Sequence, residues 1–275
     1  MLNEKNVQLG KVRSSIRELF EYGKKRKAEI GEDNVFDFSI GNPSVPAPEK
    51  VKDALIEILN TYDPVLLHGY TSAQGDYSVR KTLADYINSR FGTGLNADCL
   101  YLTCGAAASL TIVLNAILNE GDEIITPAPF FPEYRVFTQN AGGKFISVKC
   151  KEQSFALDFN AIESAITPHT KGVIINSPNN PSGVVYSEND IKTLAALLEK
   201  YSLKYGNPIY LVADEPYREL VYDKDTKVPF VMNYYPRSIV CYSYSKSLSL
   251  PGERIGYIAV NNQISEFSDL YAGIC

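Results

Sequence analysis

Short apolar runs that alternate with helical patterns constrain the fold of this chain more than any other feature of its sequence. The runs have the length of strands, and turn residues or amphipathic segments separate them. They are "CLYLT" near Leu100, "DEIITP" at Asp122, "KFISV" at Lys144, "KGVIINS" at Lys171, "PIYLVAD" at Pro208, "SIVCYS" at Ser238 and "RIGYIAV" at Arg254. Continuous apolar character indicates strands that are buried on both faces. The sequence therefore predicts an α/β fold with a mostly parallel central sheet and helices on both faces.

Two segments between these runs have the spacing of amphipathic helices. They begin at Ala106 ("AAASLTIVLNAIL") and at Ser187 ("SENDIKTLAALLEKY"), and Ser187 is an expected N-cap. Residues 1–60 differ, because they hold two helical segments and the Pro- and Gly-rich stretch "GNPSVPAPEK". We therefore expect an N-terminal part over residues 1–60 and a large domain over residues 61–275.

Composition excludes several classes of function. The net charge is −5 and no basic run exceeds "KKRK", so nucleic acid is not an expected partner. No apolar stretch approaches the roughly 20 residues that span a bilayer, so we expect no membrane association and a cytoplasmic location. Only two histidines are present, and the five cysteines form no C-x-x-C pair, so neither a metal site nor a Ser-His-Asp triad is expected.

A single lysine lies among hydroxyl side chains in "SYSKSLSLPGERIGY". This residue, Lys246, is followed eight residues later by Arg254. A lysine amine becomes a nucleophile where partial desolvation or nearby cations favour its neutral form, and it then forms Schiff bases with carbonyls. Taken alone, Lys246 is better explained as an ordinary surface lysine in a loop between strands.

Three other stretches place polar groups at the ends of predicted strands or helices. Asp214 and Tyr217 in "ADEPY" follow a very apolar run, and Asn180 lies in the turn-rich "INSPNNPSG". The stretch "LTCGAAASL" predicts a strand, a glycine and a helix start, an arrangement that exposes backbone N–H groups to a phosphate. Each also has a structural explanation, as a helix cap, a loop or tight packing. Together they describe a site for a phosphorylated aldehyde with a basic ring nitrogen, such as pyridoxal phosphate.

At this point the chain resembles a known family, the class I and II aminotransferases, which are fold-type I enzymes dependent on pyridoxal phosphate. Four motifs carry the resemblance, in the family's order and at similar separations. They are "YTSAQG" at Tyr70, "NNPSG" at Asn179, "DEPY" at Asp214 and "S-x-S-K" from Ser243 to Lys246 with Arg254 beyond it. The resemblance extends over essentially the whole chain, and it implies that residues 61–275 form the cofactor-binding domain and residues 1–60 part of a small domain.

The resemblance implies how each of these residues meets the cofactor ring. Lys246 would form the Schiff base with the aldehyde and move the substrate proton, and Asp214 would pair with the ring nitrogen. Tyr217 and Asn180 would bond the phenolic oxygen. Phe131, in "PAPFFPEY", falls where the family stacks an aromatic ring on the pyridine face, although Phe130 is its neighbour.

The resemblance also implies groups for the phosphate and the substrate. The phosphate would contact the backbone N–H groups of Ala106 and Ala107 and the side chains of Ser243, Ser245 and Arg254. Tyr70 would reach the phosphate of a neighbouring subunit, so a homodimer is expected. Gly41, in "IGNPS", falls where the family lets the substrate carboxylate approach the backbone, and Asn180 would also contact substrate.

The implied reaction is amino-group transfer from an amino acid to a 2-oxo acid. Two alternatives stay open: a carbon–sulfur lyase or decarboxylase on the same fold, and an inactive cofactor-binding fragment. The second alternative arises because the sequence ends at Cys275, well short of the family's usual length. We therefore expect a truncated aminotransferase that lacks the family's arginine for the substrate carboxylate.

Overall fold

The computed structural model describes residues 2, 4–11, 15–39 and 41–275, and these divide into two compact units. The first unit, Met1–Pro46, holds the helices α1 (Glu4–Lys11) and α2 (Ser15–Ile30) and the 3-10 helix η1 (Glu32–Asn34). The second unit, Ala47–Cys275, holds the sheet and the remaining helices. The functional division expected at residues 60 and 61 stays a prediction.

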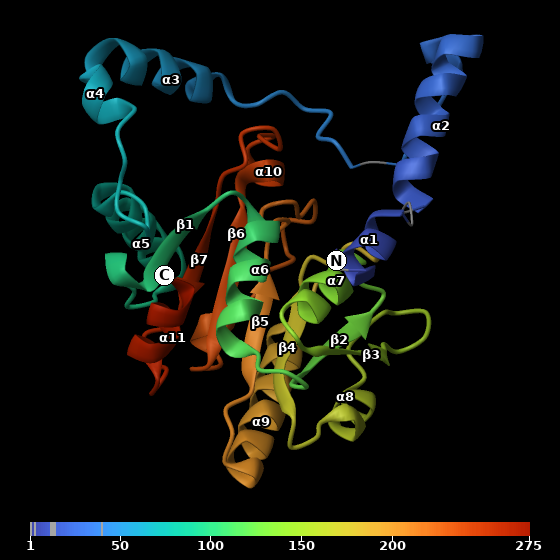
Figure 1. Ribbon diagram of the computed structural model, residues 1–275, viewed down its shortest axis with the longest axis vertical. Helices are drawn as coiled ribbons and strands as arrows, with labels where there is room; N and C mark the ends of the chain where they lie inside the picture. The colour runs from blue at the N-terminus through green and yellow to red at the C-terminus, as the bar shows by residue number, and fades with distance from the viewer. Residues whose placement is uncertain (1, 3, 12–14, 40) are drawn as a thin grey trace. The chain divides into compact units, whose positions relative to one another are not determined.

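A seven-stranded sheet with the order β1-β7-β6-β5-β4-β2-β3 forms the centre of the second unit (Figure 1). Its strands are β1 (Leu100–Thr103), β2 (Glu123–Ala128), β3 (Lys144–Lys149), β4 (Thr170–Asn176), β5 (Tyr210–Asp214), β6 (Ser238–Ser243) and β7 (Gly256–Val260). Every expected run forms a strand. Neighbouring strands are parallel except at β7, which is antiparallel to both β1 and β6. The mostly parallel sheet is thus confirmed.

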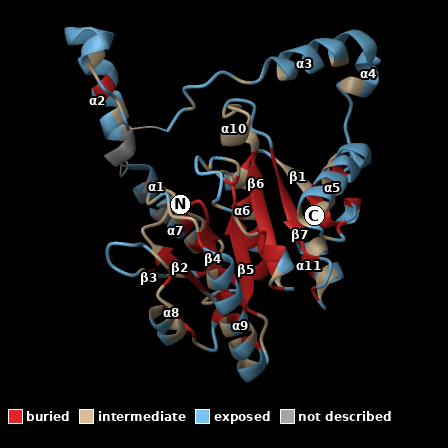
Figure 2. Ribbon diagram, turned by 180° about the vertical axis from the view of Figure 1, so that it is seen from behind, coloured by how far each residue is buried: buried red, intermediate tan, exposed pale blue. Residues whose placement is uncertain are grey.

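Helices cover both faces of this sheet. The second unit contains α3 (Glu49–Thr61), α4 (Pro64–Leu67), α5 (Tyr77–Phe91), η2 (Ala97–Cys99), α6 (Ala106–Ile117), α7 (Glu133–Asn140), α8 (Phe159–Ala165), α9 (Glu188–Tyr205), η3 (Val231–Asn233), α10 (Tyr244–Ser247) and α11 (Phe267–Ile274). Buried residues of α5, α8 and α9 pack on one face, and those of α6, α7 and α11 pack on the other. Because side chains alternate along a strand, Val173 and Ile175 join the first core while Ile174 joins the second. Figure 2 shows the buried strands between these layers.

Local sequence explains where the long helices begin and end. Ser187 caps α9 by accepting a hydrogen bond from the Asp190 backbone N–H, and the Asp190 side chain accepts one in return from the Ser187 backbone. The same helix ends at Gly206, which adopts the left-handed conformation that favours glycine.

Among the described residues, no helix combines the length and apolar character needed to cross a membrane.

Candidate active site

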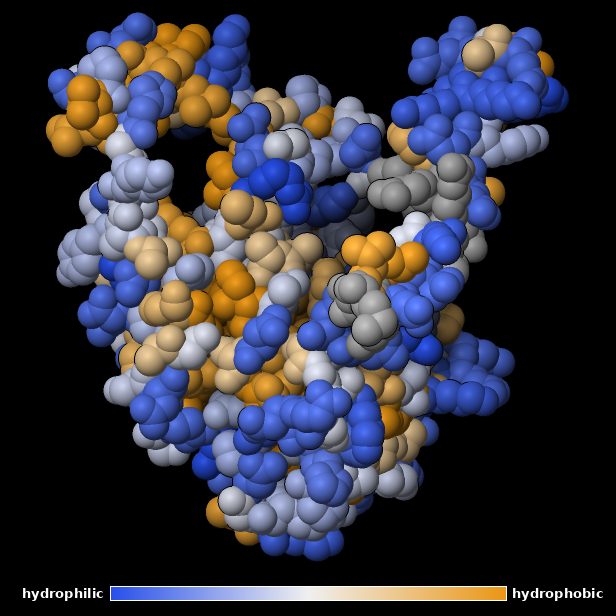
Figure 3. All heavy atoms as spheres, viewed as in Figure 1, coloured by the Kyte–Doolittle hydropathy of each residue, from blue (hydrophilic) through white to orange (hydrophobic). Residues whose placement is uncertain are grey.

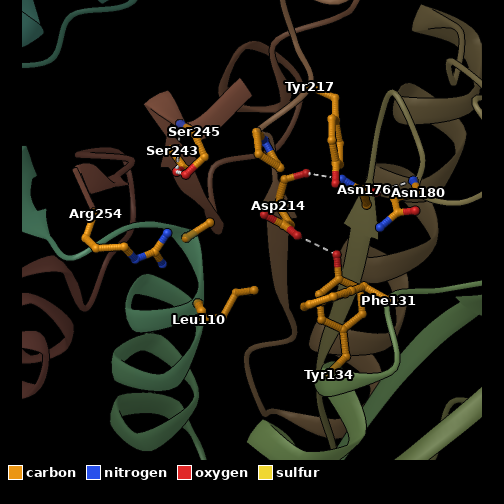
Figure 4. A pocket seen from close by; sticks show the side chains of 13 residues that line it. Leu110, Phe131, Tyr134, Asn176, Asn180, Asp214, Tyr217, Ser243, Ser245 and Arg254 are labelled. Atoms are coloured by element: carbon orange, nitrogen blue, oxygen red, sulfur yellow. Dashed lines mark hydrogen bonds between the residues drawn. The ribbon is translucent and has the colours of Figure 1, made fainter. Parts of the chain in front are cut away.

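A cavity of about 140 Å³ opens where β4, β5 and β6 end and α6 begins (Figure 4). Crevices at the carboxyl ends of parallel strands are the usual ligand sites of open α/β sheets. Nine residues that the sequence predicts for the site line this cavity: Ala106, Ala107, Phe131, Asn180, Asp214, Tyr217, Ser243, Ser245 and Arg254. Four further lining residues escaped the sequence interpretation: Leu110, Tyr134, Asn176 and Pro216.

Asp214, at the end of β5, is held by two neighbours and keeps one oxygen without a partner. The Tyr134 hydroxyl donates a hydrogen bond of 2.5 Å to Oδ2 of Asp214, and the Asn176 side chain donates one of 2.7 Å to its backbone carbonyl. Oδ1 is buried and has no hydrogen-bond partner among the described residues. A buried acceptor of this kind costs about 1–3 kcal/mol, so the site fits a ligand that donates a hydrogen bond there.

The electrostatics of Asp214 also favour a cationic donor. Burial raises the pKa of its carboxyl to about 7, the bond from Tyr134 opposes this rise, and the charge of Glu215 adds to it. Burial and the nearby Asp214 charge hold the pKa of Tyr134 well above its usual range. The phenol therefore stays protonated and acts as the hydrogen-bond donor to Asp214. A cation beside Oδ1 would return Asp214 to its ionised form at neutral pH.

Asn176 joins the ends of β4 and β5 around the cavity. Its amide donates to the Asp214 carbonyl, and its Oδ1 accepts a hydrogen bond of 2.6 Å from the backbone N–H of Asn180. On the same side, burial raises the pKa of Tyr217, the Asp214 charge raises it further, and a hydrogen bond from the Asn180 side chain lowers it. Tyr217 and Asn180 therefore place a phenol and an amide side by side in the cavity lining.

Hydroxyl groups and an arginine gather at the opposite side of the cavity, next to the start of α6. The Ser243 and Ser245 hydroxyls lie 2.8 Å apart, and the Ser245 backbone N–H donates to Ser243 Oγ. Gly105 precedes α6 with a φ of 92°, and a Cβ on it would lie 2.9 Å from Nη2 of Arg254. The positive φ favours glycine here, and the guanidinium lies close beside the helix start, where backbone N–H groups favour anions.

Lys246 lies in α10, one residue after Ser245, and is half-buried. It is not among the residues that line the cavity. Burial lowers the pKa of its amine, which increases the neutral, nucleophilic fraction. The sequence pointed to two causes for such a shift, and the structure attributes it to burial.

The two adjacent phenylalanines have different surroundings. Phe131 lines the cavity and meets Tyr134 edge to face, with ring centres 5.6 Å apart. Phe130 packs instead on Phe145, at 4.9 Å between ring centres. Of this pair, Phe131 is therefore the one available to a ring in the cavity.

Two further predicted residues are not among those that line the cavity. Tyr70 follows α4 and is fully exposed within the chain. Gly41 belongs to the first unit. Their expected contacts, with a second subunit and with the substrate carboxylate, stay predictions.

The Tyr134–Asp214 hydrogen bond leads to a first test. The Tyr134→Phe variant should have a higher Asp214 pKa, because a bond to the ionised carboxylate is worth about 1.5–3 kcal/mol. Less carboxylate then remains at neutral pH, so the midpoint of ligand capture against pH should rise by about one to two units. Calorimetric titration with pyridoxal phosphate across pH measures this. Tyr201→Phe, which removes a similar bond to Glu163 on the surface, is the control, and equal midpoints in both variants would contradict the assignment.

One cavity of this α/β fold thus brings together a buried carboxylate, a phenol and an amide and, at a helix start, hydroxyl and guanidinium groups. The family model for aminotransferase class I and II matches residues 33–270. The chain therefore belongs to the class I and II aminotransferases.

Individual relatives and solved structures support this membership. The chain is 30% identical over 257 residues to a probable aspartate aminotransferase of Methanocaldococcus jannaschii, covering 94% of this chain and 63% of the relative. It is 32% identical over 254 residues to an aspartate aminotransferase of Thermotoga maritima, covering 91% and 64%. A crystal structure of an aminotransferase from Eubacterium rectale matches with a TM-score of 0.97 and 58% identity, covering 100% of this chain and 69% of that one. The chain thus spans about 63% of the length of the first curated relatives.

Proposed function

We propose that this chain catalyses amino-group transfer from an amino acid to a 2-oxo acid with pyridoxal phosphate as cofactor. The unpartnered, buried Oδ1 of Asp214 carries the proposal, because it can accept a hydrogen bond from the protonated ring nitrogen of such a cofactor. Membership of the aminotransferase family supports the same reaction. The relatives named above are all called aminotransferases, which favours transfer over elimination or decarboxylation.

The residues around the cavity fit pyridoxal phosphate from one end to the other. Asp214 would hold the ring nitrogen, and Tyr217 and Asn180 would bond the phenolic oxygen. Phe131 would contact the ring face. The phosphate would be held at the start of α6 by backbone N–H groups and side chains from Ala106, Ala107, Ser243, Ser245 and Arg254. When bound, this cofactor withdraws electrons from the substrate Cα and makes its proton acidic.

The chain's own groups then perform two tasks. Lys246 would supply an amine, whose neutral fraction burial increases, to attach the cofactor, and it would then move the substrate Cα proton to the former aldehyde carbon. Asp214 keeps a negative charge beside the ring nitrogen, and Tyr134 and Asn176 hold this carboxylate in one orientation. Gly41 and Asn180 are proposed contacts of the substrate.

A homodimer is part of the proposal. Apolar side chains gather on the exposed surfaces of α3 and α4, as Figure 3 shows; they are Leu55, Ile56, Leu59, Val65 and Leu66. A second copy of the chain would cover them and bring its own Tyr70 to the phosphate. Light scattering of the purified chain tests this association. The cytoplasmic location stays a prediction.

The reaction itself is tested by its products. The chain loaded with pyridoxal phosphate should form glutamate from 2-oxoglutarate, and aspartate is the first donor to try because relatives carry that name. A lyase would instead release pyruvate, ammonia and sulfide from cysteine, and a decarboxylase would release carbon dioxide. Cofactor capture without any of these products would favour the inactive-fragment alternative over the proposed activity.

A further inference from the structure

Tyr242, on β6, links two turns that border the cavity. Its side chain joins the core on the sheet face covered by α5, α8 and α9, whereas Tyr134, the hydrogen-bond partner of Asp214, packs on the other face. The Tyr242 hydroxyl lies 2.8 Å from Oγ of Ser247 and 2.9 Å from Oε2 of Glu219. Neither neighbour lines the cavity, and neither belongs to a motif that the proposed reaction uses.

The direction of these hydrogen bonds follows from the number of hydrogens. A phenol has one hydrogen to give, and an ionised carboxylate can only accept. Tyr242 is the donor in both contacts, so its one hydrogen points to Glu219 or to Ser247 at any one moment. Burial holds the pKa of Tyr242 far above its usual range, so the phenol stays protonated and remains the donor that links Ser247 and Glu219.

The two hydrogen-bond partners of Tyr242 are close in sequence to residues of the proposed reaction. Ser247 follows Lys246 directly in α10, a helix of only 4 residues. Glu219 comes two residues after Tyr217 in the turn that follows β5. A single helical turn has little intrinsic stability, so its position depends on contacts of this kind. Tyr242 itself is fixed by stacking on Tyr257, with ring centres 4.9 Å apart.

We propose that Tyr242 is a positioning residue that holds the Lys246 turn in register with the Tyr217 turn. This inference rests on the proposed function, because the register matters when the Lys246 amine meets the cofactor aldehyde. In that step a bond forms between the lysine nitrogen and the aldehyde carbon. The aldehyde oxygen leaves as water with the two hydrogens that the nitrogen loses. A misplaced turn slows this attachment, whereas non-covalent capture by Asp214 and the phosphate groups does not depend on it.

The test separates attachment from capture. In the Tyr242→Phe variant, the visible band of the attached cofactor should appear about ten to a hundred times more slowly than in the unaltered chain. Non-covalent affinity, measured in a Lys246→Ala background, should stay the same with and without Tyr242→Phe. Glu219→Leu should match Tyr242→Phe, and Glu219→Gln, which keeps an acceptor, should recover most of the rate. Tyr257→Phe keeps the stacked ring and is the matched control.

A second measurement needs no cofactor. Hydrogen exchange of the backbone amides over residues 244–250 should become faster in Tyr242→Phe and Glu219→Leu and stay unchanged in Tyr257→Phe. Normal exchange together with normal attachment in Tyr242→Phe would overturn the positioning role. An unaltered chain that never attaches cofactor to Lys246 would overturn the proposed function instead, and the exchange data would still decide whether Tyr242 holds the turn.

Discussion

Replacing Lys246 with alanine is expected to lower the rate of amino-group transfer by at least about ten-thousandfold. A positioned general acid or base contributes about 10²–10⁴ to a rate, and this variant loses the covalent attachment in addition. The half-buried amine with its lowered pKa is the group that would carry both tasks. The rate is measured from glutamate formed under saturating cofactor.

Lys204→Ala is the control for that experiment, because Lys204 is an exposed lysine of α9 away from the cavity. Borohydride reduction of the loaded chain followed by peptide mapping adds a second readout. Label should appear on Lys246 in the unaltered chain and in Lys204→Ala, and it should be absent from Lys246→Ala. Transfer at an undiminished rate in Lys246→Ala, or label spread over surface lysines, would remove Lys246 from the proposed mechanism.

The sequence could predict the site wherever a residue follows directly from a strand end. Asp214 is the last residue of β5 and Asn180 lies just beyond β4, and parallel strands bring their carboxyl ends to one edge of the sheet. Tyr134 could not be found in this way. Its bond to Asp214 joins positions 80 residues apart in the chain, and in the sequence it looks like any aromatic residue that packs a helix on a sheet.

Two other features were beyond the sequence for different reasons. The apolar pattern of "RIGYIAV" indicates a strand buried on both faces but does not indicate its direction. The sequence therefore could not predict that β7 is antiparallel to its neighbours. Asn176 is the last residue of β4, and in the sequence it looks like any polar residue at a strand end. Only the structure shows that its side chain bonds both the Asp214 carbonyl and the Asn180 N–H. The roles expected of Tyr70 and Gly41 need a second subunit and a substrate to be tested.

Replacing Asp214 with asparagine is expected to lower the transfer rate about a hundredfold to a thousandfold, the effect of removing one preorganised electrostatic contact from an active site. The amide keeps the size of the carboxyl and can still accept from Tyr134, so the fold should survive. It carries no charge to hold the ring nitrogen protonated, so the loss should fall on the chemical step more than on cofactor capture.

The control for Asp214→Asn is a variant that removes a different buried carboxylate next to Asp214. Glu215 is also buried, and Arg218 donates to it and lies 5.0 Å from the ring centres of both Phe91 and Phe230. Glu215→Gln therefore removes a neighbouring buried charge without touching the cavity, and it should lower the Asp214 pKa because the repulsion between the two carboxylates disappears. Transfer should then keep most of its rate in Glu215→Gln and lose it in Asp214→Asn. Equal losses in the two variants would assign the effect to stability, since a broken buried ion pair costs about 3–5 kcal/mol.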